Sequence, residues 1–212
     1  MKNVGLEILA LQETNVNTNS IEVIDGYRFI FSTSIKNKDR EAYIKQQKQA
    51  TPKVKGKGKG KQPNPTWEKG GVGFVFSPWA WKRVKDYNQI DGRIIEVNLR
   101  SYGMTTTLIN TYCYQSKYEY ECKEAHFNNL SSIIENRSRT GIVVLLGDMN
   151  VRIEGRQEHE QQVLGQHMFG KGVEQIDNQR TDTHESRQLF MDFCIEIDLV
   201  VMNSRFEKPA GI

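Results

Sequence analysis

Apolar and polar residues alternate in blocks along the chain, and one apolar block stands out. Ile142-Val-Val-Leu-Leu146 is an unbroken run of branched residues with Gly141 before it and Gly147 after it. A run of this length between glycines is typical of a β-strand buried on both faces. Polar residues follow at once, because Asp148 and Asn150 stand two positions apart directly after the run.

The remaining apolar segments predict further strands and two helices. Short apolar or alternating runs predict strands at residues 6–13, 27–32, 70–77, 93–99, 105–112 and 199–202. Residues 78–84 predict one short helical turn. Apolar residues recur at helical spacing in 118–137 and again behind Asp182, which forms a helix-capping signal with Glu185. Close backbone packing accounts for the glycines that open the 70–77 strand.

The order of these elements predicts the fold class. Strands, a helix, a buried strand, a helix and a strand indicate an α/β protein, a four-layer α/β/β/α sandwich of two packed mixed sheets. The length of 212 residues is that of one α/β domain, so we expect residues 1–212 to form a single domain. With 37% hydrophobic and 26% charged residues, the composition is that of a globular protein.

Three features of composition bear on the compartment. The sequence has no signal-peptide pattern and no apolar run of membrane-spanning length, so we expect an intracellular protein without membrane association. Its three cysteines are an odd number without a Cys-x-x-Cys pair. This usage argues against a disulfide framework and for a reducing compartment.

The net charge of +3 hides an uneven distribution. Residues 45–61 contain seven of the 29 basic residues, all lysines, and no acid. The rest of the chain has 22 basic and 26 acidic residues, which is a net charge of −4. This stretch lies within a Lys-, Gln- and Gly-rich segment at about 36–66, for which the composition predicts a disordered insertion. It is either a basic arm that binds phosphate backbones or a surface insertion without function.

Polar residues with useful chemistry follow several predicted strands. Glu13 ends the first, Tyr112 ends the 105–112 strand, and Asp148 with Asn150 follows the buried run. A carboxylate can bind Mg²⁺, a second can activate water, and an amide and a phenol can hold a phosphate. Ordinary roles compete with this interpretation: Gly-Asp-x-Asn is also turn composition, Glu13 can be a solvated strand end, and Tyr112 can be packing.

Five motifs occur in an order that resembles the endonuclease/exonuclease/phosphatase superfamily. They are Leu9-Ala-Leu-Gln-Glu-Thr14, Gly70-Gly-Val-Gly-Phe74, Asp91-Gly-Arg-Ile-Ile95, Ile109-Asn-Thr-Tyr112 and Leu146-Gly-Asp-Met-Asn150. Within it, the chain is most similar to the apurinic-type endonuclease domain of non-long-terminal-repeat retrotransposons and to craniofacial development protein 2-like proteins. Residues 163–170 and 192–200 also resemble that subgroup.

The resemblance implies a role for each candidate residue. Glu13 is then a ligand of Mg²⁺, or of Mn²⁺, and Tyr112 contacts the scissile phosphate. Asp148 activates or orients the attacking water, and Asn150 steadies the phosphate. The implied partner is DNA, and the implied location is the nucleus if the substrate is genomic DNA.

The sequence also departs from the family pattern. It lacks the opening Trp-Asn strand and the closing Asp-His pair, so the domain is expected to be clipped at both ends and weakly active or inactive. His184 has a passing likeness to the missing histidine, but its context is that of a helix cap or a solvated residue. Tyr114 stands where relatives usually have proline.

The sequence therefore predicts metal-dependent hydrolysis of DNA phosphodiesters by a retrotransposon-type endonuclease domain. Two alternatives stay open at this point. One is a phosphatase of the same superfamily, and the other is a remnant that binds nucleic acid without catalysis.

Overall fold

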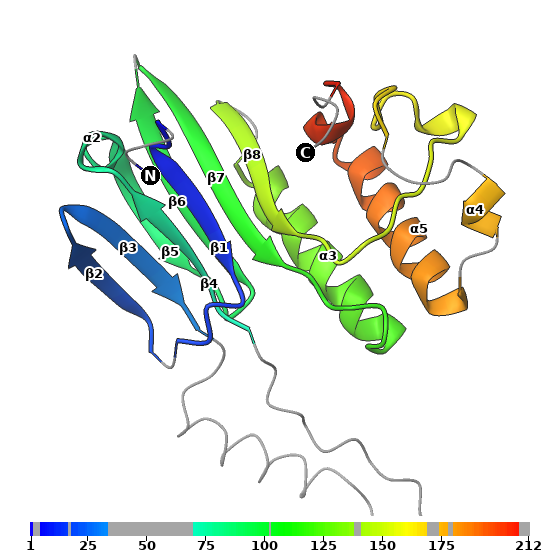
Figure 1. Cartoon of the computed structure of the whole chain (residues 1–212), viewed down its shortest axis with the longest axis horizontal. Coiled ribbons are helices and arrows are strands. Elements are labelled where there is room, and N and C mark those ends of the chain that lie inside the picture. The colour runs from blue at the N-terminus through cyan, green and yellow to red at the C-terminus, as the bar shows by residue number, and fades with distance from the viewer. Residues whose placement is uncertain are drawn as a thin grey trace, which may run out of the picture. The chain divides into compact units, whose positions relative to one another are not determined.

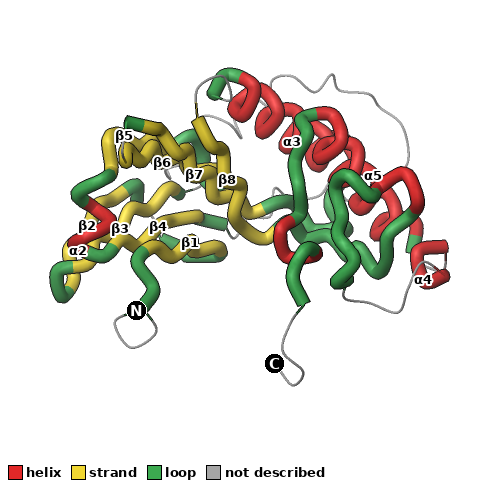
Figure 2. The backbone as a smooth tube through the Cα atoms, turned by 90° about the horizontal axis from the view of Figure 1, so that it is seen from above, coloured by secondary structure: helices red, strands yellow, loops and turns green. Residues whose placement is uncertain are grey.

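The computed structural model describes residues 1, 5–16, 18–33, 70–101, 103–137, 141–168, 174–177 and 180–207. The chain divides into two compact units, the first comprising Met1–Tyr112 with Val144–Gly147 and the second Cys113–Val143 with Asp148–Ile212. Strands build most of the first unit, and the second carries the two long helices (Figure 2). The insertion predicted at 36–66 lies outside the described residues. The expectation of a single domain stays a prediction.

The first sheet belongs to the first unit and has four strands in the order β1-β4-β3-β2 (Figure 1). They are β1 (Ile8–Gln12), β2 (Ser20–Ile24), β3 (Tyr27–Ser32) and β4 (Val72–Phe76), and all three pairings are antiparallel. A short helix, α2 (Pro78–Trp81), follows β4 as the sequence predicted, and the Ser77 hydroxyl caps it by accepting a hydrogen bond from the Ala80 N–H.

The second sheet has the order β5-β6-β7-β8. Its strands are β5 (Val84–Gln89), β6 (Ile94–Ser101), β7 (Met104–Tyr112) and β8 (Gly141–Asp148), and β6 pairs antiparallel with both β5 and β7. β6 and β7 are consecutive along the chain and form an antiparallel hairpin. β8 passes through both units, because only Val144–Gly147 belong to the first.

The core of the first unit lies where the two sheets pack face to face. Phe74 and Phe76 of β4 are fully buried there with Ile95 and Val97 of β6. Tyr112, the last residue of β7, is part of the same cluster and is only 4% exposed. The core therefore reaches the end of the strand at which a candidate functional residue stands.

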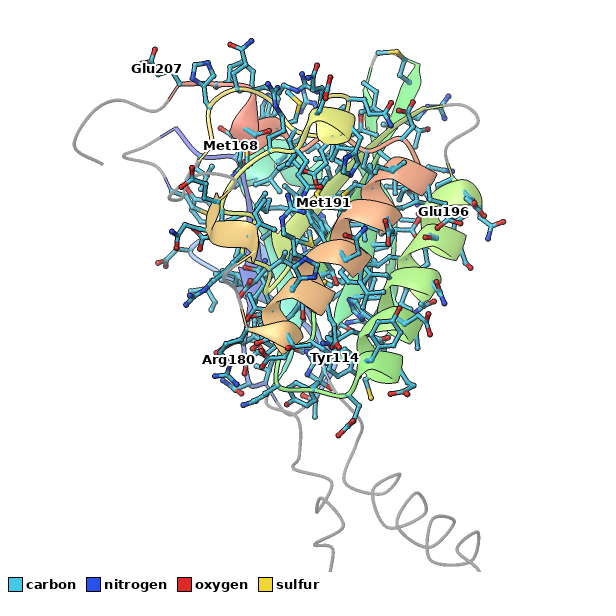
Figure 3. All side chains as sticks on the ribbon, turned by 90° about the vertical axis from the view of Figure 1, so that its right-hand side faces the viewer. Tyr114, Met168, Arg180, Met191, Glu196 and Glu207 are labelled. Carbon is cyan, nitrogen blue, oxygen red and sulfur yellow. The ribbon has the colours of Figure 1, made fainter. Side chains whose placement is uncertain are left out.

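The second unit is built on two helices, α3 (Tyr120–Glu135) and α5 (Thr181–Glu196), both predicted from apolar periodicity. Phe127 of α3 packs on Phe190 and Phe193 of α5, with ring centroids 6.2 and 5.1 Å apart. The helices lie side by side with their N-terminal ends at the same end of the pair, where Figure 3 labels Tyr114 and Arg180.

Three short helices complete the described part of the second unit. They are α4 (Glu174–Asp177) and two 3₁₀ turns, η2 (Glu158–Glu160) and η3 (Met202–Ser204). None of the helices in the described ranges is long and apolar enough to cross a membrane.

Several sequence-based expectations need correction. β8 is the last strand of its sheet, and Ile142 is 56% exposed, so the run is not buried on both faces. β1, at the predicted strand 6–13, is also an outer and half-buried strand, although its apolar run is typical of a buried one. The strand predicted at 199–202 is reduced to one parallel bridge between Leu164 and Val201, followed by η3. Helix α5 begins with Arg180 as its N-cap residue, without a side-chain cap.

Candidate active site

Glu13 occupies the first position after β1, and its backbone is unusual. It has φ of 53°, a left-handed conformation that non-glycine residues rarely adopt. The turn is held in place, because Asn15 Nδ2 donates to the Glu13 carbonyl at 2.9 Å and the Thr14 N–H donates to the Gly71 carbonyl at 3.1 Å. The side chain of Glu13 is exposed, so its carboxylate is available to a ligand.

Gly71 makes room for this turn. Its φ is +95°, and a Cβ atom at this position would lie 2.4 Å from Thr14 Oγ1. Within β4, a Cβ on Gly73 would lie 2.7 Å from the Ile30 carbonyl oxygen. Both glycines are therefore required by close packing, as the sequence predicted.

Tyr112 meets Glu13 inside the first unit. Its hydroxyl donates a hydrogen bond of 2.5 Å to Glu13 Oε1, although the two residues are 99 positions apart in the sequence. Arg93 packs over the phenol ring, with its guanidinium carbon 5.0 Å from the ring centroid. Arg93 also donates from Nη1 to the Tyr112 carbonyl at 2.9 Å and is itself only 6% exposed.

Asn110 fixes the end of β1 from the opposite sheet. It is fully buried, and its Nδ2 donates to the carbonyls of Leu11 at 2.9 Å and Gly73 at 2.8 Å. Its Oδ1 accepts a hydrogen bond of 2.6 Å from Gln12 Nε2. Both ends of the Asn110 amide therefore have hydrogen-bond partners. One of these partners, Gln12, directly precedes Glu13, so Asn110 holds the strand end from which Glu13 projects.

Asp148 and Asn150 lie together in the second unit. Asp148 Oδ1 accepts a hydrogen bond from the Asn150 N–H at 2.9 Å, and the Asp148 carbonyl accepts from the Cys113 N–H at 2.9 Å. Asn150 Nδ2 donates to the Cys113 carbonyl at 2.7 Å. Asn150 has φ of 51°, so it shares the left-handed backbone of Glu13. The carboxylate of Asp148 is exposed and keeps one oxygen for a ligand.

A cavity of about 400 Å³ opens beside this second pair. Its lining comes entirely from the second unit and consists of Gln115, Ser116, Lys117, Asp148, Asn150, Val151, Arg152 and Thr183. Most of these side chains are polar, and two are cationic. The cavity therefore suits a polar, anionic ligand.

The structure thus brings the four predicted residues together as two pairs, Glu13 with Tyr112 and Asp148 with Asn150. The sequence indicated no role for Arg93 or Asn110, although both lie inside the five motifs. Arg93 contacts Tyr112, and Asn110 holds the end of the strand that precedes Glu13. His184 is exposed in the first turn of α5, as expected of a solvated residue.

Comparison with known proteins relies on structure alone, since no family model and no curated protein matches the sequence. An apurinic endonuclease from Leishmania major superimposes with a TM-score of 0.52 and 13% identity over 93% of this chain and 59% of that one. For an apurinic endonuclease from Archaeoglobus fulgidus the TM-score is 0.48 and the identity 17%, over 90% of this chain and 62% of that one. For the TDP2 protein of Caenorhabditis elegans the TM-score is 0.35 and the identity 18%, over 71% of this chain and 39% of that one.

The likeness to the Leishmania structure shows the fold. The chain shares its fold with that apurinic endonuclease, and the predicted α/β sandwich built on two packed sheets with helices is confirmed. The chain spans about 59% of the length of that structure.

Proposed function

We propose that this chain belongs to a divalent-metal-dependent nuclease that hydrolyses phosphodiester bonds in DNA. The observation that carries the proposal is the hydrogen bond between Tyr112 and Glu13, which joins two candidate residues from distant parts of the sequence. The fold shared with an apurinic endonuclease supports it. The Leishmania protein is an apurinic endonuclease, which agrees with a DNA substrate.

The donor chemistry fits a hard divalent cation at Glu13. In the described residues no three His, Cys, Asp or Glu side chains gather as a complete metal cage. Mg²⁺ does not need one, because it usually takes one or two carboxylates and completes its shell with water and substrate phosphate oxygens. A single exposed carboxylate therefore fits Mg²⁺, or Mn²⁺, whose bound form would neutralise charge on the phosphate.

The remaining roles belong to the chain's own side chains. Asp148 accepts the proton of a water molecule whose oxygen attacks phosphorus. The P–O bond to the leaving nucleotide breaks, and the departing oxygen takes up a proton from solvent water. Asn150 has one amide hydrogen left after its bond to Cys113 and can donate it to a phosphate oxygen. Tyr112 has a single hydroxyl hydrogen, so it donates to phosphate only after releasing Glu13.

Nicking of supercoiled plasmid with Mg²⁺ tests the proposal. We expect Asp148→Asn and Glu13→Gln each to lower the rate by about 100-fold or more. The double variant should lose little beyond the worse single, because residues that act in one reaction are not additive. Nicking that persists with a chelator, or that is unchanged in Asp148→Asn, would exclude this function. Thr18→Ala is the matched control, since this exposed residue belongs to neither pair.

The finer assignment rests on the sequence motifs. We propose an apurinic-type endonuclease domain of the non-long-terminal-repeat retrotransposon kind, acting on genomic DNA in the nucleus. Low turnover by the 212-residue chain stays the expectation drawn from the missing family motifs. A labelled duplex containing one abasic site, compared with the undamaged duplex, would measure the preference for apurinic sites.

A further inference from the structure

The cavity beside Asp148 is lined by more basic than acidic side chains. Its lining contains two basic side chains, Lys117 and Arg152, and one acid, Asp148. Both basic residues are exposed. Lys117 Nζ lies 5.7 Å from the centroid of the Tyr118 ring. Within the described ranges neither Lys117 nor Arg152 has a side-chain hydrogen bond or an ion pair. Two cations that are not neutralised by the protein can therefore be neutralised by a ligand.

The wall that carries Lys117 is fixed from behind by a buried lysine. Lys123 of α3 is 3% exposed, and its ammonium donates to the Ser116 carbonyl at 3.4 Å and to Ser186 Oγ of α5 at 3.2 Å. Glu185 lies 3.8 Å away and balances its charge. The ammonium thereby ties the segment before α3 to α5, so this side of the cavity is held in one arrangement.

The wall that carries Arg152 is fixed in the same way by a buried arginine. Arg187 of α5 donates from Nε to the Ile153 carbonyl at 3.0 Å and from Nη2 to the Gly155 carbonyl at 3.0 Å. Its charge is balanced by Glu160, with Nη1 and Oε1 2.7 Å apart. Both walls are thus braced by charges that are already neutralised, which leaves Lys117 and Arg152 for a ligand.

The cavity lies where α3 and α5 begin. Ser116 and Lys117 precede α3, and Thr183 is in the first turn of α5; the two helices start at the same end in Figures 1 and 3. Helix N-termini favour anions. However, Glu119 and Asp182 also stand at these ends, so the preference for an anion comes mainly from the two basic side chains.

We propose that Lys117 and Arg152 bind a backbone phosphate of the DNA strand that neighbours the scissile one. The inference rests on the proposed function and adds a substrate requirement, since productive binding then needs a nucleic-acid chain and not an isolated phosphodiester. Arg152 supplies a planar fork suited to two phosphate oxygens, Lys117 supplies a point charge, and Thr183 supplies a hydroxyl. Asp148 and Asn150, at the same cavity, are left to the scissile group.

The test compares two substrates in the full chain. Arg152→Gln and Lys117→Gln are assayed on a labelled DNA duplex and on bis(p-nitrophenyl) phosphate, a diester without neighbouring phosphates. We expect KM for DNA to rise about tenfold per variant with little change in kcat, and hydrolysis of the small diester to be unchanged. Arg100→Gln and Lys82→Gln remove the same charges from exposed positions in the first unit and serve as matched controls.

A binding arm separates failure of this inference from failure of the proposed function. DNA affinity is measured in chelator over a range of salt, where no turnover is needed. The cavity variants should bind DNA about tenfold more weakly, with a salt slope reduced by about one per residue, and the controls should change little. Equal loss in cavity and control variants would overturn the inference. So would variants that keep their DNA affinity but lose binding of inorganic phosphate, since the cavity would then take free phosphate.

Discussion

The buried ion pair between Arg187 and Glu160 offers the sharpest test of the second unit. The two side chains are 2% and 1% exposed and form two hydrogen bonds, of 2.7 and 2.8 Å. Glu160 also accepts from the Gln157 N–H at 2.7 Å. Replacing Glu160 by glutamine keeps the shape but leaves the guanidinium charge buried without its carboxylate.

The expected cost follows from burial. Removing one partner of a buried pair destabilises proteins by about 3–5 kcal/mol, because the other charge stays without compensation. Folded domains are stable by only about 5–15 kcal/mol, so Glu160→Gln should remove about a fifth or more of the total free energy of unfolding. The double variant Arg187→Met with Glu160→Leu should lose less than either single substitution, although it also leaves the Ile153 and Gly155 carbonyls without their donor.

The pair also predicts a dependence on pH. Burial by itself raises the pKa of Glu160, but the hydrogen bonds from Arg187 and from the Gln157 N–H outweigh it, so the pKa is lowered in the folded state. A lowered pKa means that the stabilisation is complete above the unfolded value of about 4.3 and is lost as the pH falls through the folded value. The stability gap between the native chain and Glu160→Gln should therefore shrink on acidification.

Urea unfolding followed by circular dichroism measures both effects. The native chain, Glu160→Gln and the double variant are compared near neutral pH and at pH values below the unfolded pKa of glutamate. Glu158→Gln is the control, because this neighbouring glutamate is exposed in the same 3₁₀ turn. A cost below about 1 kcal/mol, or a gap that widens with acid, would refute the account of the pair.

Three further outcomes are expected. Asn110→Leu should cost about 2–4 kcal/mol in urea unfolding and lower nicking, because two buried carbonyls lose their donor. Gly147→Ala should prevent soluble expression, since a Cβ there would lie 1.9 Å from the Thr111 carbonyl oxygen, whereas Gly103→Ala, in open space, should express. Deleting residues 45–61 should weaken DNA binding and flatten its salt dependence without changing the rate at saturating DNA; unchanged binding at low salt would make the segment a neutral insertion.

The sequence located the candidate residues because their signal is local. An apolar run that ends in Glu13, Tyr112 or Asp148 can be seen without knowing which strands are neighbours. Asp148 and Asn150 are two positions apart, so their contact is local as well. The contact between Tyr112 and Glu13 is long-range, and the sequence could not tell that these two residues meet. The supporting role of Arg93 was hidden for the same reason, since its ring contact with Tyr112 depends on the β6–β7 register.

The two strands that the sequence missed have little buried surface. β2 and β5 are outer strands of their sheets, and most of their side chains are exposed. Without a buried face there is no selection for alternating apolar residues, so the period-two signal is absent. At 199–202 the error is the opposite one, because the sequence predicted a strand that the structure does not contain. Its apolar residues suggest pairing, but Val200 is 43% exposed and the described residues supply it with one bridge only.

Glu13 and Asn150 share an unusual backbone conformation, in addition to a proposed role in the same reaction. Each is in the left-handed region directly after or just beyond a strand, and each is held there by a side-chain hydrogen bond, from Asn15 in one unit and to Cys113 in the other. Asparagine tolerates this region, but for glutamate it costs of order 1–3 kcal/mol. A turn selected for stability alone would carry glycine or asparagine at position 13. The chain instead keeps a carboxylate there and builds Gly71 and Asn110 around it, which is the arrangement expected when the oxygen atoms of Glu13 are needed for binding.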